Sequence, residues 1–162
     1  VRVNGKLKTV EENIKLLHQL ENINVIGTCT TSMLNITRFV DICKYFESLG
    51  VWHHTSLVQY PNELNIKNLP VPLKEKVTKD WDEYKDTLTD NKNHKRIKMF
   101  GQKCIDYMNS QHSDKWETFL KYSLVLDRNQ GTSLLDWYPE FIPFVDTAWQ
   151  DKFAGKISSA VV

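Results

Sequence analysis

The chain has 162 residues, of which 41% are hydrophobic and 25% are charged, which is enough for one globular domain with a hydrophobic core. Its formal net charge is +1, so the overall charge balance gives no indication of nucleic-acid or anionic-membrane binding. Its three cysteines are too far apart for a CxxC or CxxxCxxC metal motif, and their odd number favours a reducing, cytoplasmic compartment. No apolar run approaches the roughly 20 residues of a membrane span.

Helical and strand patterns alternate in the first third of the chain. A T-x-x-E capping box at Thr9 and Glu12 predicts a helix to about Glu21. The β-branched run 23–30 predicts a strand buried on both faces. Asn35 is placed to cap a second helix that stops at Gly50. A second strand, 51–60, is ended by a proline.

This order, with connections of only a few residues, is typical of right-handed βα units around a parallel sheet, so we predict an α/β fold. The next segment, 62–76, is extended and carries two prolines. Helical patterns follow over about 73–88, 95–110 and 113–128, with a polar, turn-like stretch between the first two. The aromatic, proline-containing end cannot hold a long helix, and a hydrophobic tail packed on the domain is the favoured interpretation.

Polar side chains gather where the two predicted strands end. In parallel βα folds, ligands bind at the carboxyl ends of the strands, so these side chains are candidate ligand contacts. The simpler alternative is that they only satisfy loop backbone, with Asn35 acting as a helix cap. The residues concerned are Thr28, Thr30, Ser32, Asn35, Gln59 and Tyr60.

The histidines and cysteines are weaker candidates for metal ligands or reactive groups. His53 and His54 are adjacent in the second strand and must point to opposite faces, so at most one of them can reach a shared site. Neither has a carboxylate or thiol at a metal-binding spacing. Cys29 within the first strand and Cys104 on a helical apolar face are expected to be buried and inert.

A family resemblance follows from four segments taken in order. They are "VRVNGKLKTVEENIKLL", "NVIGTCTTSMLNI", "LVQYPNELNIKNLP" and "LDRNQGTSLLDWYPEF". Together they resemble the C-terminal half of radical S-adenosylmethionine enzymes, in particular the group with a twitch extension found in tailed-phage and marine viral genomes. The resemblance covers residues 1–141. Since the chain opens on Val1 with residues typical of a protein interior, we expect a fragment.

The resemblance implies a fold and a division of the chain. The implied fold is the C-terminal part of a partial (βα)6 barrel with parallel strands, followed by a helical tail. Residues 1–70 would be the last βα units, 71–141 the twitch-like extension, and 142–162 a tail without an assigned role. The remaining strands would lie in a missing N-terminal half. A viral protein of this kind would work in the host cytoplasm.

The resemblance also implies a cofactor and its contacts. Enzymes of this family bind a 4Fe–4S cluster that reductively cleaves S-adenosylmethionine to a 5′-deoxyadenosyl radical, which abstracts a hydrogen atom from the substrate. Thr28, Thr30, Ser32 and Asn35 would contact the ribose and methionine parts. The backbone of residues 58–60 would pair with the adenine edge, and Arg2 would lie near the methionine carboxylate. The cofactor-contact set implied is therefore Arg2, Thr28, Thr30, Ser32, Asn35, Val58, Gln59 and Tyr60.

Departures from the family limit this expectation. The cluster motif is absent, so the 4Fe–4S ligands would lie outside this chain and we expect the chain to be inactive alone. Cys104 is the only cysteine after the second predicted strand, which argues against an auxiliary cluster. The expected partners are an unidentified peptide or small-metabolite substrate, the missing half, and an electron donor such as flavodoxin or ferredoxin, with no membrane or nucleic acid evident. The alternative is a non-enzymatic α/β module that binds a protein through its aromatic tail.

Overall fold

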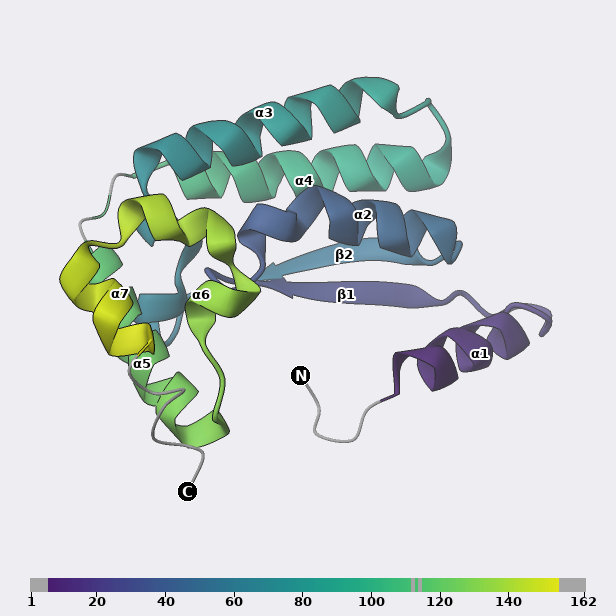
Figure 1. Cartoon of the computed structure of the whole chain (residues 1–162). Helices are drawn as coiled ribbons and strands as arrows, with labels where there is room; N and C mark the ends of the chain where they lie inside the picture. Colours follow the sequence, from purple (N-terminus) through teal and green to yellow (C-terminus); the bar gives the residue numbers. More distant parts are fainter. Residues whose placement is uncertain (1–5, 112, 114, 155–162) are drawn as a thin grey trace.

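The structure is a computed structural model that describes residues 6–111, 113 and 115–154. A helix precedes two strands that flank another helix, and the remainder of the described chain is helical (Figure 1). The main elements are α1 (Leu7–Leu17), β1 (Ile26–Thr31), α2 (Phe39–Ser48), β2 (Trp52–Leu57), α3 (Val71–Thr87), α4 (Lys92–Asn109), α5 (Trp116–Gln130), α6 (Leu134–Trp137) and α7 (Thr147–Ala154). Short 3-10 helices are η1 (Ile36–Arg38), η2 (Asn62–Leu64), η3 (Ile66–Asn68) and η4 (Pro139–Phe144).

The two strands pair in parallel, and within the described residues they form the whole sheet. The prediction of a partial (βα)6 barrel is therefore wrong for this structure, which is mainly helical with one small sheet. The helix–strand–helix–strand order and the parallel pairing are both present. The physical reason for the error is that the order of elements fixes their local pairing but not the number of strands in a sheet.

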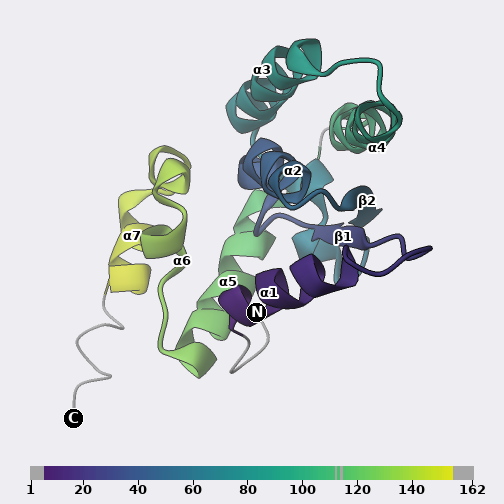
Figure 2. The ribbon, with the colours of Figure 1, turned by 90° about the vertical axis from the view of Figure 1, so that its right-hand side faces the viewer.

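Helices replace the missing strands as the support of this sheet. Helix α2 covers one face, where Phe46 lies 5.3 Å from the buried His53 ring. An added Cβ at Gly27 would stand only 3.1 Å from Phe46, so β1 and α2 approach closely at that glycine. Figure 2 shows α2 between the sheet and α3, with α4 directly beside β2. Because a two-stranded sheet alone is only marginally stable, this helical cover is required.

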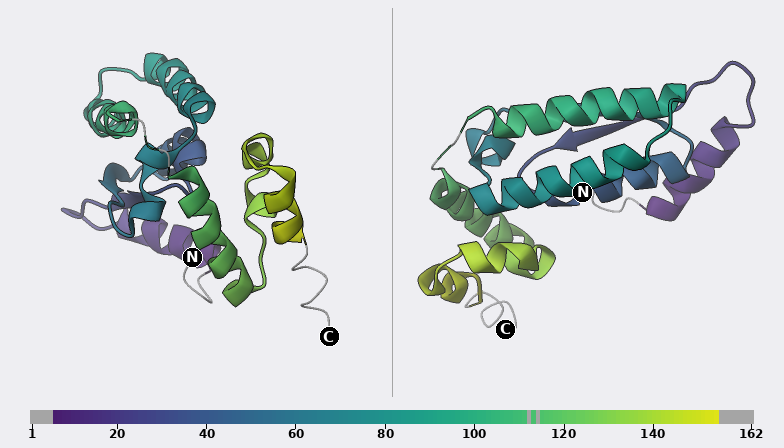
Figure 3. Two further views of the ribbon diagram at one scale, coloured as in Figure 1. Left: turned by 90° about the vertical axis from the view of Figure 1, so that its left-hand side faces the viewer. Right: turned by 90° about the horizontal axis from the view of Figure 1, so that it is seen from above.

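The main hydrophobic core joins α2, α3 and α4. Trp81 is fully buried, and its ring lies 5.7 Å from that of Phe39 on the helix that covers the sheet. Helix α4 passes Trp81 at Gly101, where the two long helices come closest. The views of Figure 3 show α3 and α4 running antiparallel along the length of the strands, with α5, α6 and α7 grouped beyond one end of them.

The aromatic end of the chain packs onto α5, as the sequence predicts. Trp116 stacks on Phe119 and donates a 2.8 Å hydrogen bond from its indole Nε1 to the carbonyl of Phe144. Phe141 and Phe153 are buried, and only short helices form in this part of the chain. Trp137 is the exception, with 65% of its surface exposed. These rings therefore extend the hydrophobic core to this end of the molecule.

Three local predictions are wrong. Helix α1 begins after Lys6 with no side-chain cap, so Thr9 lies inside the helix and the predicted capping box is not used. Strand β1 is buried on one face rather than two, because none of the described residues forms a second layer over its other face. The polar stretch 89–96 was predicted to be turn-like, but from Lys92 onward it belongs to α4. Gly50 follows α2 with a φ of +64°, which confirms the predicted helix stop.

We predict that Gly101→Ala destabilises the protein, although the same change in an ordinary helix is stabilising by about 1 kcal/mol. The new Cβ would lie 2.0 Å from Cη2 of the buried Trp81 ring. Overpacking of this kind costs about 1–3 kcal/mol or more of unfolding free energy. Urea denaturation measures the change. Adding Trp81→Phe removes the clashing ring atoms, so the two losses should be less than additive, and fully additive losses would contradict the proposed contact.

Candidate functional site

The carboxyl ends of β1 and β2 lie side by side. Their register pairs Thr30 with Ser56 and Thr31 with Leu57. The amide of Val58 extends the ladder by donating a 2.9 Å hydrogen bond to the carbonyl of Thr31. The loops that follow the two strands therefore start at one edge of the sheet. We call this edge, formed by residues 30–35 and 56–60, the strand-end rim.

The two faces of β1 differ in character. Cys29 and Thr31 point towards the interior, where the Thr31 hydroxyl lies 3.5 Å from the Cys29 Sγ. Thr28 and Thr30 are on the opposite face and are exposed, together with Ile26. The hydroxyl groups of Thr28 and Thr30 are thus accessible to a ligand lying on the open face of the sheet. Their role as ligand contacts stays a prediction.

Ser32 and Asn35 instead hold the loop after β1 in place. The Asn35 side chain donates from Nδ2 to the carbonyl of Thr30 at 2.9 Å and accepts from the amide of Ser32 at 2.8 Å. The Ser32 hydroxyl accepts from the amide of Leu34 at 3.2 Å. Asn35 occupies the N-cap position of η1, but its side chain makes no cap hydrogen bond to that helix. Both residues are therefore positioning residues of the rim.

The loop after β2 contributes mainly backbone. The amide of Val58 is already bonded to Thr31, which leaves residues 59 and 60 as candidates for pairing with a flat base. Within the described residues, the backbone groups of Gln59 and Tyr60 make no hydrogen bond. Tyr60 is 86% exposed, so its ring is available to a ligand. Arg2, the remaining predicted contact, lies outside the described residues.

The two adjacent histidines lie on opposite faces, as the strand pattern predicts. His53 is fully buried beside Phe39 and Phe46, and its Nε2 is 2.6 Å from the Thr55 hydroxyl. Burial, with a smaller contribution from the charge of His54, lowers the pKa of His53 to about 4. His54 lies on the open face, with its ring 4.9 Å from that of Phe100. His53 is thus a neutral core residue, whereas His54 borders the candidate site.

The thiols do not fit an iron–sulfur cluster. Cys29, Cys43 and Cys104 are free and buried, and they come from three different elements. Burial raises the pKa of each thiol, that of Cys104 to about 12, which disfavours the thiolate that binds metal. Among the described residues, no group of three or more His, Cys, Asp or Glu side chains could hold a metal ion.

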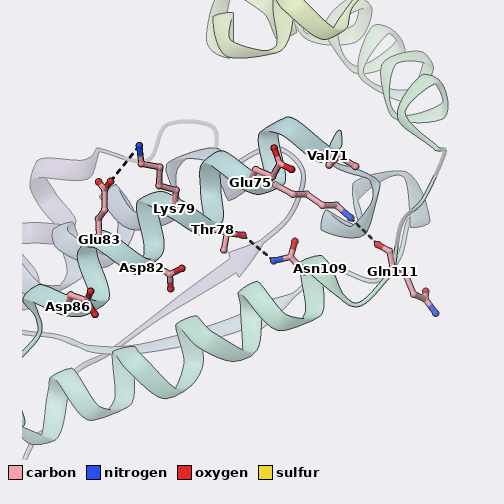
Figure 4. Close-up of a pocket in the computed structure, with 10 residues that line it drawn as sticks. Val71, Glu75, Thr78, Lys79, Asp82, Glu83, Asp86, Asn109 and Gln111 are labelled. Atoms are coloured by element: carbon pink, nitrogen blue, oxygen red, sulfur yellow. Dashed lines mark hydrogen bonds and ion pairs between the residues drawn. The ribbon is translucent and has the colours of Figure 1, made fainter.

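Two grooves lie away from the rim, along α3. The first, of about 720 Å³, runs between α3 and the end of α4 and is drawn in Figure 4. Its charges are largely paired, as in the 3.8 Å contact of Lys79 with Glu83 and the 2.9 Å bond from Lys74 to the carbonyl of Gln111. The second lies between α2 and α3 and is spanned at one end by Arg38 and Glu140, 3.6 Å apart. Neither groove gathers catalytic groups.

A basic and aromatic border along α4 was missed by the sequence reasoning. Lys92 and Arg96 lie over the ring of Trp52, at 4.8 Å and 4.7 Å from its centroid. The available signal was the segment 92–105, which holds five Lys or Arg residues and no Asp or Glu. The overall charge of +1 hides this local excess.

Comparisons with known proteins give no relatives. No family model, no curated protein and no solved structure matches the chain. Among the described residues, no helix combines the length and apolar character that crossing a membrane requires.

We predict that Asn35→Ala destabilises the protein by about 1–3 kcal/mol, because the Thr30 carbonyl and the Ser32 amide both lose their partner. Thermal or urea unfolding measures the loss. Asn109→Ala, which removes a hydrogen bond to Thr78 on an exposed surface, is the matched control and should change stability by a few tenths of that amount. Equal effects of the two substitutions would contradict the role of Asn35 in the rim.

We also predict that the free energy of unfolding depends on pH because of His53. An imidazole whose pKa is lower in the folded than in the unfolded state binds fewer protons when folded, so stability is lost as pH falls from about 6.5 towards 4. The loss should reach about 3 kcal/mol. In His53→Phe this component should be absent, whereas His54→Gln should retain it. Urea unfolding at a series of pH values measures both, and identical pH profiles for wild type and His53→Phe would contradict the assignment.

Proposed function

We propose that the strand-end rim binds S-adenosylmethionine and that the chain works as part of a radical S-adenosylmethionine enzyme. The observation that carries the proposal is the parallel register of β1 and β2, which brings the loop after Thr31 beside the loop after Leu57. The same two loops hold the segments that resemble that family. A parallel pair also directs exposed hydroxyls and open backbone to one edge, where a nucleoside is commonly held.

In this proposal, the residues of the rim contact different parts of S-adenosylmethionine. Thr28 and Thr30 would donate and accept hydrogen bonds with the ribose and methionine parts, since both hydroxyls are exposed on the open face. Gln59 and Tyr60 would pair with the adenine edge through their unpaired backbone groups. Ser32 and Asn35 would act indirectly by fixing the loop that carries Thr30. Arg2 is proposed for the carboxylate on the resemblance alone.

An iron–sulfur cluster does not fit the three buried cysteines of this chain. In the proposed enzyme its ligands would come from polypeptide outside this sequence. In the family that the sequence resembles, S-adenosylmethionine supplies hydrogen abstraction after reductive cleavage. The contribution of this chain would be to bind and orient the nucleoside. The substrate and an electron donor of the flavodoxin or ferredoxin type belong to the same proposal.

The non-enzymatic alternative has less support. It assigns partner binding to the aromatic tail, yet Phe141, Trp149 and Phe153 are buried in the hydrophobic core. A protein contact through α1 has more support, because its apolar side chains are largely exposed, with Val10 at 51% and Leu16 at 59%. Such a contact is compatible with the proposed enzyme, which requires further polypeptide.

Saturation-transfer NMR with S-adenosylmethionine tests the proposal on the 162-residue chain. We expect transfer to the adenine and ribose protons, and Thr30→Val should weaken binding by roughly tenfold, equivalent to about 1.4 kcal/mol for a lost hydrogen bond. Thr118→Val, an exposed change on α5, is the matched control and should leave binding unaltered. Absence of transfer to the wild-type chain, or equal binding by both variants, would contradict the proposal.

A further inference from the structure

The open face of the sheet continues without interruption onto one side of α4. Thr28 is paired with His54 across the two strands, and the His54 ring contacts Phe100 of α4. The Lys103 Nζ lies over the same Phe100 ring, 5.9 Å from its centroid. A surface therefore runs from the exposed threonines of β1, across β2, to the helix beside it.

Aromatic rings and cations alternate along this surface. Trp52 lies under Lys92 and Arg96, and Tyr107 lies under Lys67 at 4.3 Å. The α4 residues involved recur every three or four positions, so they share one side of the helix. We call this surface the basic–aromatic face; its residues are Thr28, Thr30, Trp52, His54, Lys67, Lys92, Arg96, Phe100, Lys103 and Tyr107.

The positive charge of this face is not neutralised. Within the described residues, Lys95 is the one Lys or Arg of α4 that forms an ion pair, 3.1 Å from Asp90, and His94 of the same helix lies 2.6 Å from Glu47. Lys92, Arg96 and Lys103 have no carboxylate within 4 Å in the described structure. The Nε of Arg96 is buried and makes no hydrogen bond in the described structure. Unpaired cations at this density attract a polyanion.

We infer that the basic–aromatic face binds single-stranded nucleic acid. Cations one helical turn apart, about 5–6 Å, are suitably placed for successive phosphates, and half-exposed rings between them offer stacking surfaces to bases. Neither groove along α3 contains any residue of this face. An extended polymer suits such a surface better than a small molecule does. Acidic peptide would satisfy the cations but would leave the rings unused.

This inference goes beyond the proposed function and does not depend on it. The pairing of Thr28 with His54 would nevertheless bring a strand bound on this face next to the rim. In an enzyme of the proposed type, nucleic acid would then be the substrate class. Binding of nucleic acid and binding of S-adenosylmethionine are separate measurements, so the failure of one is distinguishable from the failure of the other.

Fluorescence anisotropy with a labelled oligothymidine of about 15 nucleotides tests the inference on the full 162-residue chain. The variant Lys92→Gln/Lys103→Gln removes two exposed cations of the face and should weaken binding at least tenfold at about 50 mM salt. Lys79→Gln/Lys121→Gln makes the same charge change on exposed positions of α3 and α5 and should stay within about twofold. Circular dichroism confirms that each variant is folded.

Further binding measurements test whether the ligand is single-stranded nucleic acid. The slope of log K against log salt should fall by about 1.4 in the first variant, for two lost phosphate contacts on a single strand. An abasic strand of equal length should bind more weakly, and so should a duplex or a poly-glutamate of matched charge. No binding by the wild type, equal loss in both variants, or equal binding of the abasic strand, the duplex or poly-glutamate would each overturn the inference.

Discussion

The structure depends on a parallel ladder between only two strands. Such a ladder leaves most of the edges and faces of its strands uncovered, so packed helices have to stabilise it. Helix α2 covers the face that carries His53, and the Trp81 indole joins α2 to the α3–α4 hairpin. The close approach of α4 at Gly101 then places that helix alongside β2. The arrangement buries one face of the sheet and leaves the other open.

This asymmetry concentrates the candidate functional groups. The exposed threonines of β1, the histidine of β2 and the cations of α4 all lie on or beside the uncovered face. The buried thiols and His53 lie within the core, where burial opposes their ionisation. Chemistry that involves this chain is thus expected at the open face and the rim. The rim would hold a nucleoside, and the basic–aromatic face would hold an extended anion.

Local patterns predicted much of the fold. The β-branched runs predicted both strands and their parallel pairing, and three long helices after the prolines were predicted to within a few residues. The barrel was not predictable in this way, because strand number depends on tertiary packing rather than on the order of elements. Similarly, Thr9 and Glu12 fit a capping box, but the helix begins at Leu7. Tertiary context decides which of several possible starts is used.

For the site, sequence reasoning located the strand ends but could not separate ligand contacts from loop support. Asn35 fits either role, and only its bonds to Thr30 and Ser32 distinguish them. The contact of α4 with Trp52 joins positions 40 or more residues apart, and no local pattern reveals such a contact. The run of cations in 92–105 was visible in the sequence, but its proximity to the sheet was not.

The parallel register is tested most directly by nuclear Overhauser effects between backbone protons of β1 and β2. The account predicts cross-strand contacts that link Thr28 with His54 and Thr30 with Ser56, so that residue numbers rise together along both strands. Contacts in which one number rises while the other falls would show antiparallel pairing. That result would separate the two loops of the rim and contradict the account.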